Sequence, residues 1–257
     1  MIANYHTHTW RCNHATGTEQ EYVEQGIQAG LKILGFSDHG PYIFPGEYYS
    51  KFRMKLSMLD DYVEAIVNLR KAYKGKIEIP LGLELEYYPE LFSGLLPVLR
   101  DYPLDYLLLG QHFVGNEFDS PYSGLATDDL HMIRKYVDQS IDAMQTGLFT
   151  YFAHPDLLHF CGDRKTYCRE MLRICREAKA CGIPLEYNLL GLAGGRNYPN
   201  PDFWRLAAEE GCLVVIGRDA HQANAFLDME TLHKAKAFLS DLGIVPLQTV
   251  SLRSIHI

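Results

Sequence analysis

The sequence predicts an α/β protein, a closed β/α barrel formed by one domain of residues 1–257. Two observations predict it. Short β-branched or leucine-rich runs alternate about seven times with longer segments of helical period, and a chain of 257 residues suits one closed barrel. An open doubly wound sheet is the alternative, but no G-x-G-x-x-G turn follows the first predicted strand.

The predicted elements follow one another in strict alternation. The strands are Ile2–His8, Ile33–His39, Ile77–Glu86, Tyr106–Phe113, Tyr151–Pro155, Pro184–Leu189 and Leu213–His221. The helices between and after them are Glu19–Leu31, Ser57–Tyr73, Glu90–Arg100, Asp128–Thr146, Lys165–Ala180, Pro201–Glu210 and Met229–Leu242. Thr18 and Glu21 form a T-x-x-E capping box, and glycines such as Gly182 and Gly211 stand at helix ends.

Composition excludes several classes of partner. The chain has 24 Lys and Arg against 32 Asp and Glu, a formal charge of −8, so neither nucleic acid nor an anionic membrane is expected as the main partner. There is no apolar run of the roughly 20 residues that a membrane span needs, and no signal-peptide pattern. We therefore expect a cytoplasmic protein whose six cysteines, without a C-x-x-C pair, are packed thiols. The oligomeric state has no signature in the sequence.

Histidines gather near the start of the chain, in the stretch Asn4–His14. Residues i and i+2 of a strand point to the same side, so His6 and His8 project together and can hold one metal ion. Four other histidines fall in helices, a loop or the tail and are interpreted as ordinary structural or surface residues. They are His131, His159, His233 and His256.

Six of the seven predicted strands end on a side chain that can bind a metal. In a β/α barrel the carboxyl ends of the strands converge on one mouth, where active sites are built. The residues are His6 and His8 on the first strand, with His14 in the loop after it, then His39, Glu84, His112, His154, and Asp219 with His221. We therefore expect them to meet at one site.

Histidine and carboxylate ligands without cysteine favour zinc, manganese or iron in a catalytic rather than a structural site. Nine candidate side chains are too many for one ion, so two or three divalent ions are expected, with Glu84 bridging two of them. Glu86 points to the same side of its strand and is a rival ligand. It ranks lower because it lies beyond the turn into Tyr87-Tyr88-Pro89.

At these residues the sequence resembles the PHP superfamily, named for polymerase and histidinol phosphatase. The motifs H-x-H, a further His, D-H, G-x-E, a lone His, A-H-P and D-A-H occur in that order from His6 to His221. The resemblance implies a distorted seven-stranded (β/α)7 barrel of the PHP type. It also implies three ion sites: His6, His8, Glu84 and Asp219; Glu84, His112 and His154; and His14, His39 and His221.

Within this superfamily the chain looks most similar to the monofunctional histidinol-phosphatases. The similar stretches are His6–His14, Leu185–Asn188, Gly195–Pro199, and His154-Pro155-Asp156 followed by Arg164. Trp10-Arg11 departs from that pattern, which has aromatic and small or apolar residues there. The resemblance implies hydrolysis of a small phosphorylated substrate, histidinol phosphate, in histidine biosynthesis.

The expected reaction assigns roles to residues around the ions. Metal ions would hold the phosphate oxygens and lower the pKa of water. We expect Glu84, Asp219 and His221 to act in catalysis, and Asp156 to cap its loop, orient a histidine or protonate the leaving group. Arg164 and Arg196, with Arg11 as a third candidate, are expected to bind phosphate, because guanidinium groups match its oxygens.

Two further segments flank the expected site. Asp38, next to His39, is expected to orient a ligand histidine, or else to cap its loop. The loop Pro41–Lys55 carries five aromatic residues, and it is interpreted as a lid over a flat ring such as imidazole, with a packed surface loop as the alternative.

Three other functions compete with the histidinol-phosphatase hypothesis. A PHP phosphoesterase could act on a nucleotide-derived monoester or a phosphotyrosine, and a substrate panel separates these. A metal-binding regulatory module without activity is disfavoured by the complete set of candidate ligands. A barrel deaminase or amidohydrolase shares H-x-H and a final aspartate, but a ligating lysine at a strand end is missing here.

Overall fold

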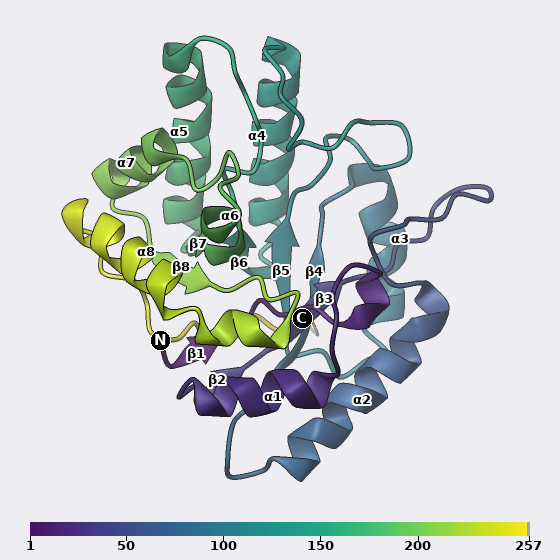
Figure 1. The fold of residues 1–257 in the computed structure, drawn as a ribbon. Coiled ribbons are helices and arrows are strands. Elements are labelled where there is room, and N and C mark those ends of the chain that lie inside the picture. The colour runs from purple at the N-terminus through teal and green to yellow at the C-terminus, as the bar shows by residue number, and fades with distance from the viewer. Residues whose placement is uncertain (256–257) are drawn as a thin grey trace.

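The computed structural model describes residues 1–255 and confirms the α/β barrel architecture (Figure 1). Every paired strand is parallel to its neighbour, and the hydrogen-bonded order is β1-β2 and β3-β4-β5-β6-β7-β8. The strands are β1 Ala3–Asn4, β2 Ile33–Leu34, β3 Phe36–His39, β4 Leu81–Leu85, β5 Tyr106–Gly110, β6 Phe149–Ala153, β7 Leu185–Asn188 and β8 Val214–Gly217. Since His256 lies outside the described residues, its assignment to the tail stays a prediction.

The chain after β1 contacts both edges of the six-stranded sheet. The predicted strand Ile33–His39 is divided at Gly35 into β2 and β3. The amide of Ser37 in β3 donates to the carbonyl oxygen of Thr7 at 2.9 Å, and Thr7 forms a parallel bridge with Ala220, which follows β8. The first strand therefore lies between β3 and the end of β8, as a seven-stranded barrel requires.

Helices cover the outside of this ring (Figure 1). They are α1 Glu19–Gln28, α2 Leu59–Ala72, α3 Pro89–Leu99, α4 Leu130–Gln145, α5 Arg164–Cys181, α6 Leu189–Ala193, α7 Pro201–Glu210 and α8 Met229–Asp241. All seven predicted helices occur within a few residues of their expected bounds. The short α6 and three 3-10 helices were not predicted, because so few residues show no periodicity. These are η1 Trp10–Cys12, η2 Leu56–Met58 and η3 Ala223–Leu227.

The predicted helix ends are also confirmed. Thr18 and Glu21 exchange hydrogen bonds as a capping box at the start of α1. Gly182 and Gly211 end α5 and α7 in the left-handed conformation, with φ of 60° and 71°. Glycine suits these positions because it adopts positive φ without a Cβ clash.

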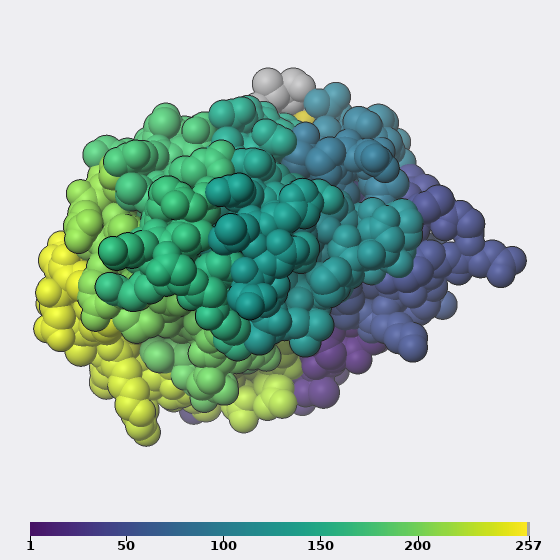
Figure 2. All heavy atoms as spheres, turned by 90° about the horizontal axis from the view of Figure 1, so that it is seen from above, coloured from purple at the N-terminus to yellow at the C-terminus, as the bar shows by residue number. Residues whose placement is uncertain are grey.

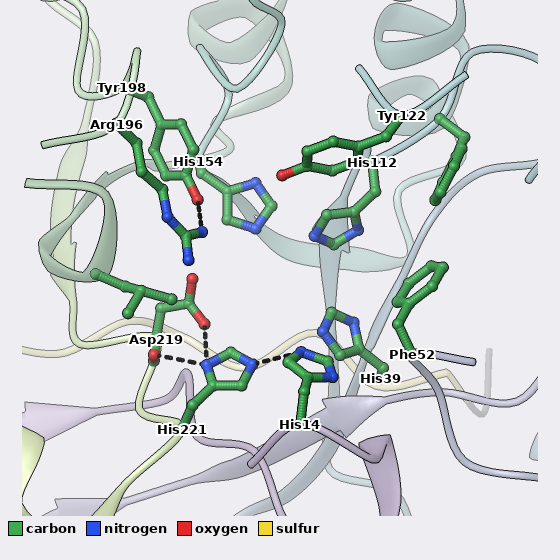
Figure 3. A pocket seen from close by; sticks show the side chains of 12 residues that line it. His14, His39, Phe52, His112, Tyr122, His154, Arg196, Tyr198, Asp219 and His221 are labelled. Atoms are coloured by element: carbon green, nitrogen blue, oxygen red, sulfur yellow. Dashed lines mark hydrogen bonds and ion pairs between the residues drawn. The ribbon is translucent and has the colours of Figure 1, made fainter. Parts of the chain in front are cut away.

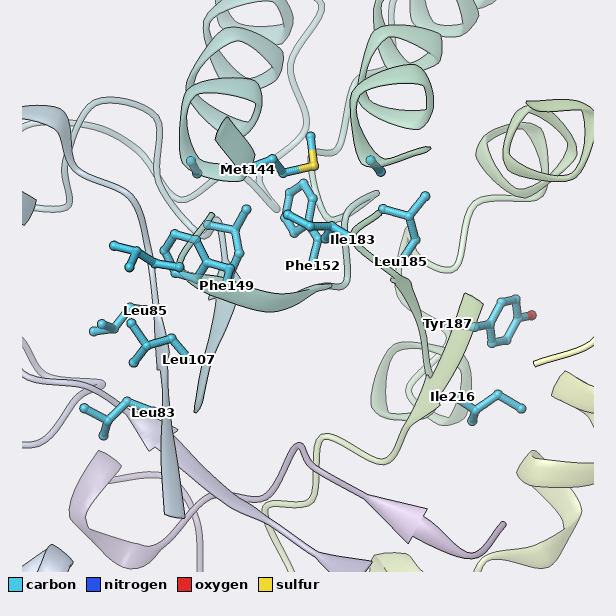
Figure 4. Packing of buried hydrophobic residues seen from close by; sticks show 14 of the residues in the cluster. Leu83, Leu85, Leu107, Met144, Phe149, Phe152, Ile183, Leu185, Tyr187 and Ile216 are labelled. Carbon is cyan, nitrogen blue, oxygen red and sulfur yellow. The ribbon is translucent and has the colours of Figure 1, made fainter. Parts of the chain in front are cut away.

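The hydrophobic core has an outer and an inner part. Alternate residues of the strands point outward and pack under the helices, as Leu83, Leu107 and Phe152 do in Figure 4. The other residues point into the barrel and form a second cluster around Tyr106, Leu108 and Tyr151. Within residues 1–255 no helix is long and apolar enough to cross a membrane.

The loop between β3 and η2, which contains the predicted lid, projects from one side of the molecule (Figures 1 and 2). Its tip is exposed at Tyr48 and Tyr49. Nearer the barrel, Phe52 and Arg53 turn inward, and the Arg53 side chain is fully buried. The loop is thus exposed at its tip and anchored at its base.

Candidate metal centre

The predicted ligand residues converge at the carboxyl ends of the strands, where they border a cavity of about 430 Å³ (Figure 3). His39 ends β3, Glu84 lies in β4, and His154 directly follows β6. The cavity is lined by His14, His39, Phe52, His112, Phe113, Tyr122, His154, Leu190, Arg196, Tyr198, Asp219 and His221. His6, His8 and Glu84 are fully buried beneath it.

Glu84 lies in the middle of the cluster, with its two carboxylate oxygens facing different imidazoles. Oε1 is 2.9 Å from Nε2 of His154 and 3.7 Å from Nε2 of His112. Oε2 is 3.0 Å from Nδ1 of His39, 3.5 Å from Nε2 of His6 and 3.6 Å from Nε2 of His8. This division of neighbours is what a carboxylate that bridges two ions requires.

Asp219 approaches the same histidines from the other side of the barrel. Its Oδ1 atom lies 3.1 Å from Nε2 of His8 and 3.5 Å from Nε2 of His6. Both Asp219, with φ 49°, and His154, with φ 34°, adopt a positive φ that is uncommon for residues other than glycine. Such backbone strain is maintained by the surrounding structure and is typical of functional sites.

The buried polar atoms of this cluster fit divalent metal ions. Buried polar groups in folded proteins normally form hydrogen bonds, and atoms without one call for a ligand. Here the unpartnered atoms face one another at close range, but without hydrogen-bond geometry. They are Nε2 of His6, Nε2 of His8, Nδ1 of His39, both Glu84 oxygens and Oδ1 of Asp219. Imidazole and carboxylate donors of this kind suit zinc and similar ions.

A further group of three histidines lies nearer the solvent. Ring nitrogens of His14, His39 and His221 lie within 4.8 Å of one another. His14 follows η1, and its Nε2 atom lies 2.9 Å from Nε2 of His221. The three residues expected to hold a third ion are therefore close together.

Two buried carboxylates, Asp38 and Glu86, support the histidines from outside the cluster. Asp38 lies 3.3 Å from Nδ1 of His8, so it contacts a candidate ligand histidine, as expected for an orienting residue. Glu86 is not a rival ligand: its Oε1 accepts from Nδ1 of His112 at 2.7 Å, on the ring edge away from Glu84. Glu86 was correctly placed on the same side of the chain as Glu84. It directly follows the end of β4, however, and lies behind the imidazole ring of His112.

Glu186 in β7 was not predicted as part of the site. Its Oε1 atom lies 2.9 Å from Nδ1 of His6, and its Oε2 atom accepts the backbone N–H of His154 at 3.1 Å. A sequence signal does exist, because Glu186 and Asn188 alternate with apolar residues on a short strand and so point into the barrel. A buried carboxylate in that position requires a partner.

The charges of the cluster shift the pKa values of its members. Burial opposes ionisation of Glu84, but His112, His6 and His39 lower its pKa well below the usual value. Burial also opposes ionisation of Asp219, whose pKa is nevertheless held well below its usual range by His6 and its neighbours. Both carboxylates are therefore ionised near neutral pH and available as ligands.

The histidines respond in opposite directions. Burial would lower the pKa of His6, but Glu186, Asp219 and Glu84 raise it well above the usual value. Burial lowers the pKa of His39 well below the usual value, and the nearby His8 adds to this. His39 is thus held neutral, the form in which imidazole binds metals.

Two of the three arginines expected to bind phosphate do not line the cavity. Arg164 is exposed at the start of α5 and forms two hydrogen bonds, of 2.5 and 2.6 Å, with Asp202 at the start of α7. Arg11 is buried between Glu19 and Asp61, 2.6 Å from the carboxylate of Asp61. Carboxylates from other elements pair with both guanidinium groups, so neither position supports phosphate binding, and that role stays a prediction for Arg164 and Arg11.

Asp156, expected as a candidate proton donor, also lies outside the cavity lining. Its Oδ2 atom accepts the backbone N–H of Asn200 at 2.5 Å and the indole N–H of Trp204 at 3.0 Å. Burial raises the pKa of this carboxyl to about 7. Asp156 therefore joins the loop after β6 to α7, as a residue that caps its loop would, while its alternative roles as a histidine-orienting residue or proton donor stay predictions.

Arg196 is the predicted arginine that does line the cavity. Figure 3 shows it beside Tyr198 on one wall, with Phe52 and Tyr122 on the opposite wall. Its Nη1 atom donates to the Tyr198 hydroxyl at 2.7 Å. The cavity thus has metal-ligand residues at its base, one guanidinium group on a side wall and aromatic rings opposite.

A parallel β/α ring with a buried cluster of histidines and carboxylates at its carboxyl end defines the class, a β/α barrel with a candidate metal centre. Residues 4–189 match the family model described as PHP domain, and the chain belongs to this family. The family resemblance of the sequence is therefore confirmed.

Individual histidinol-phosphatases are similar to this chain in sequence or in fold. A probable histidinol-phosphatase of Deinococcus radiodurans is 32% identical over 227 residues, 86% of each chain. The histidinol-phosphatase of Bacillus subtilis is 27% identical over 256 residues, covering 85% of this chain and 92% of the relative. The crystal structure of histidinol phosphate phosphatase from Lactococcus lactis, complexed with zinc, L-histidinol and phosphate, is 22% identical with a TM-score of 0.76 over 97% of both chains.

Proposed function

We propose that the protein is a metal-dependent phosphatase that hydrolyses L-histidinol phosphate to L-histidinol and phosphate. The observation that carries the proposal is the Glu84 carboxylate, with one oxygen facing His112 and His154 and the other facing His6, His8 and His39. The relatives named histidinol-phosphatase support it. The substrate belongs to histidine biosynthesis, and the proposed location is the cytoplasm.

The proposed metal content is two or three divalent ions, zinc, manganese or iron. The residues that would hold them are His6, His8, His14, His39, Glu84, His112, His154, Asp219 and His221. When bound, such ions supply positive charge for the phosphate oxygens and lower the pKa of water, so that hydroxide is available near neutral pH. We further propose that residues 1–257 act as one domain.

The side chains above the cluster would bind and orient the two ends of the substrate. Arg196 offers N–H donors to the phosphate, and guanidinium groups bind such oxygens bidentately. On the wall opposite Arg196, Phe52 and Tyr122 offer ring faces to the imidazole ring of the substrate. Asp219 and His221 line the cavity beside this position, which supports their proposed part in catalysis.

Hydrogen bonds to buried carboxylates fix the orientation of three candidate ligand histidines. Glu186, Asp38 and Glu86 accept from the outer nitrogens of His6, His8 and His112, so that the inner nitrogens face Glu84 and Asp219. Because these histidines are already oriented, they need not rearrange when a phosphate ester binds.

The test is to measure phosphate released from histidinol phosphate by metal-loaded protein, with bound metal counted by elemental analysis. We expect turnover by the native chain and none by the His6→Ala/His8→Ala double variant. Phosphate release no faster than that of the variant, with metal bound, would contradict the proposal.

A panel of other phosphate monoesters compared by kcat/KM separates the competing phosphatase functions, since specificity lies in differential binding of transition states. If a nucleotide-derived ester or phosphotyrosine has a higher kcat/KM than histidinol phosphate, that ester is the proposed substrate instead. Metal binding that raises the melting temperature without turnover of any ester would instead support a regulatory module.

A further inference from the structure

The base of the loop after β3 carries a buried guanidinium group, Arg53, that the proposed reaction does not use. Its side chain is 1% exposed and lies between two buried carboxylates. Its Nη2 atom is 2.8 Å from Oε2 of Glu86 and 2.5 Å from Oε2 of Glu117, to which Nε also donates at 2.8 Å. Desolvating three charges is costly and need not stabilise the fold, so a role in specifying local geometry has to be considered.

Glu86 transmits the position of Arg53 to the metal cluster. One oxygen of this carboxylate faces Arg53 and the other accepts from Nδ1 of His112 at 2.7 Å. With a proton on Nδ1, the lone pair of His112 lies on Nε2, the nitrogen 3.7 Å from Oε1 of Glu84. A shift of Glu86 would therefore turn or displace this imidazole.

Arg53 also contacts the backbone at Gly40 and the ring of Phe52, which lines the cavity. Its Nη1 atom donates to the carbonyl oxygen of Gly40, directly after His39, at 2.8 Å. The guanidinium carbon lies 4.5 Å from the centre of the Phe52 ring. That ring is 5.4 Å from His39 and 6.0 Å from His112, so it closes one side of the cavity beside two candidate ligands.

We propose that Arg53 is a positioning residue that sets His112, through Glu86, and the Phe52 wall of the cavity as one unit. The proposal rests on the proposed metal-dependent phosphatase function. The base of the loop is then a fixed part of the site. Loss of Arg53 removes the counter-charge that Glu86 and Glu117 share, so that the two buried carboxylates repel each other and move.

The test uses the full-length, metal-loaded protein and compares Arg53→Met with Arg53→Lys and with Arg176→Met as a matched control. Arg176 is an exposed arginine of α5 that pairs with Glu210 and does not line the cavity. Lysine retains the charge but cannot make the forked contacts of arginine, so its effect is expected to lie between those of the other two.

Zinc retained during equilibration with graded chelator gives the readout that does not depend on activity. We expect Arg53→Met to lose one zinc ion at an about 10–100-fold lower chelator concentration than the native chain does. Replacing other residues that orient metal ligands lowers metal affinity by this factor. The control is expected to match the native chain. We also expect kcat to fall and KM for histidinol phosphate to rise, because both the ligand and the wall move.

Glu86→Gln keeps the size of the side chain and tests the route if Arg53→Met does not fold. It is expected to weaken the same ion, and the double variant is expected to lose little more than either single variant, since the two residues act in series. Native zinc retention, kcat and KM in Arg53→Met would overturn the proposal. Failure of the native chain to hydrolyse histidinol phosphate would refute the proposed function, while the zinc comparison would still decide the role of Arg53.

Discussion

The inside of the barrel has two layers that differ in how well their polar atoms are satisfied. One layer is apolar and is formed by Ala3, Tyr5, Tyr106, Leu108, Tyr151, Ala153 and Val215. The other layer borders the candidate metal centre, is polar, and is formed by His6, His8, Glu84, Glu186 and Asp219. Both layers are buried, yet the unpartnered atoms of His6, His8, Glu84 and Asp219 all belong to the polar layer.

The difference separates a layer whose polar atoms are satisfied within the protein from one that holds the candidate ligands. In the apolar layer the hydroxyl of Tyr106 is 2.6 Å from the carbonyl oxygen of Tyr5 and 3.0 Å from that of Phe36, so its polar atom is satisfied within the protein. In the polar layer the facing atoms of His6, His8, Glu84 and Asp219 have no hydrogen-bond partner within the protein. Tyr151, whose hydroxyl lies 3.3 Å from Oε1 of Glu186, joins the two layers.

The largest effect is expected from Glu84→Gln in the polar layer. The change keeps the shape of the side chain but removes the charge that faces five imidazoles. We expect kcat/KM for histidinol phosphate to fall by more than about 100-fold, beyond the loss seen for residues that only orient a ligand. Bound metal measured on the same samples should fall as well. Full metal content and activity would contradict the bridging role.

Two glycines on neighbouring strands give a matched comparison of the layers. A Cβ at Gly110 would lie 2.0 Å from Oε1 of Glu84, and a Cβ at Gly82 would lie 2.6 Å from the Tyr106 ring. Both alanine variants should lose about 1–3 kcal/mol of unfolding free energy through overpacking. Only Gly110→Ala should also lose activity, by about 100-fold, because it displaces a group in the site.

Urea unfolding and kcat/KM measured on both glycine variants check this comparison. Equal losses of activity in Gly82→Ala and Gly110→Ala would remove the functional distinction between the layers.

A smaller effect is expected from Glu186→Gln. The amide can accept from His6 or donate to it, but not fix one arrangement as the carboxylate does. Metal affinity or activity should fall about 10–100-fold. Chelator titration together with initial rates provides the measurement. An unchanged affinity would mean that the contact with His6 serves packing alone.

The smallest functional effect is expected in the apolar layer. Tyr106→Phe removes the hydroxyl next to the carbonyl oxygens of Tyr5 and Phe36. Unfolding free energy should fall by about 1–3 kcal/mol, the cost of leaving a buried group unsatisfied, while kcat/KM stays unchanged. Thermal or urea unfolding and steady-state kinetics measure the two quantities. A large loss of activity at full metal content would show that the layers are coupled.

The sequence by itself predicted the barrel and the set of candidate ligands. Strand and helix periods gave the order of the elements, and parallel strands bring their carboxyl ends together whatever the loops do. The positions of His6, His39, Glu84, His154 and Asp219 followed from that rule alone. Their relation to the family followed from the order of the motifs.

Only the tertiary structure decided which side chains stand around those ligands. Glu186 lies next to His6, Glu86 behind His112, and Asp202 takes Arg164 away from the cavity, each through contacts between elements distant in sequence. Strand alternation gives the side of the sheet on which a residue lies, but not its depth or its partner. Those depend on barrel curvature and helix packing, because a buried charged group needs a counter-charge or hydrogen bonds that another element supplies.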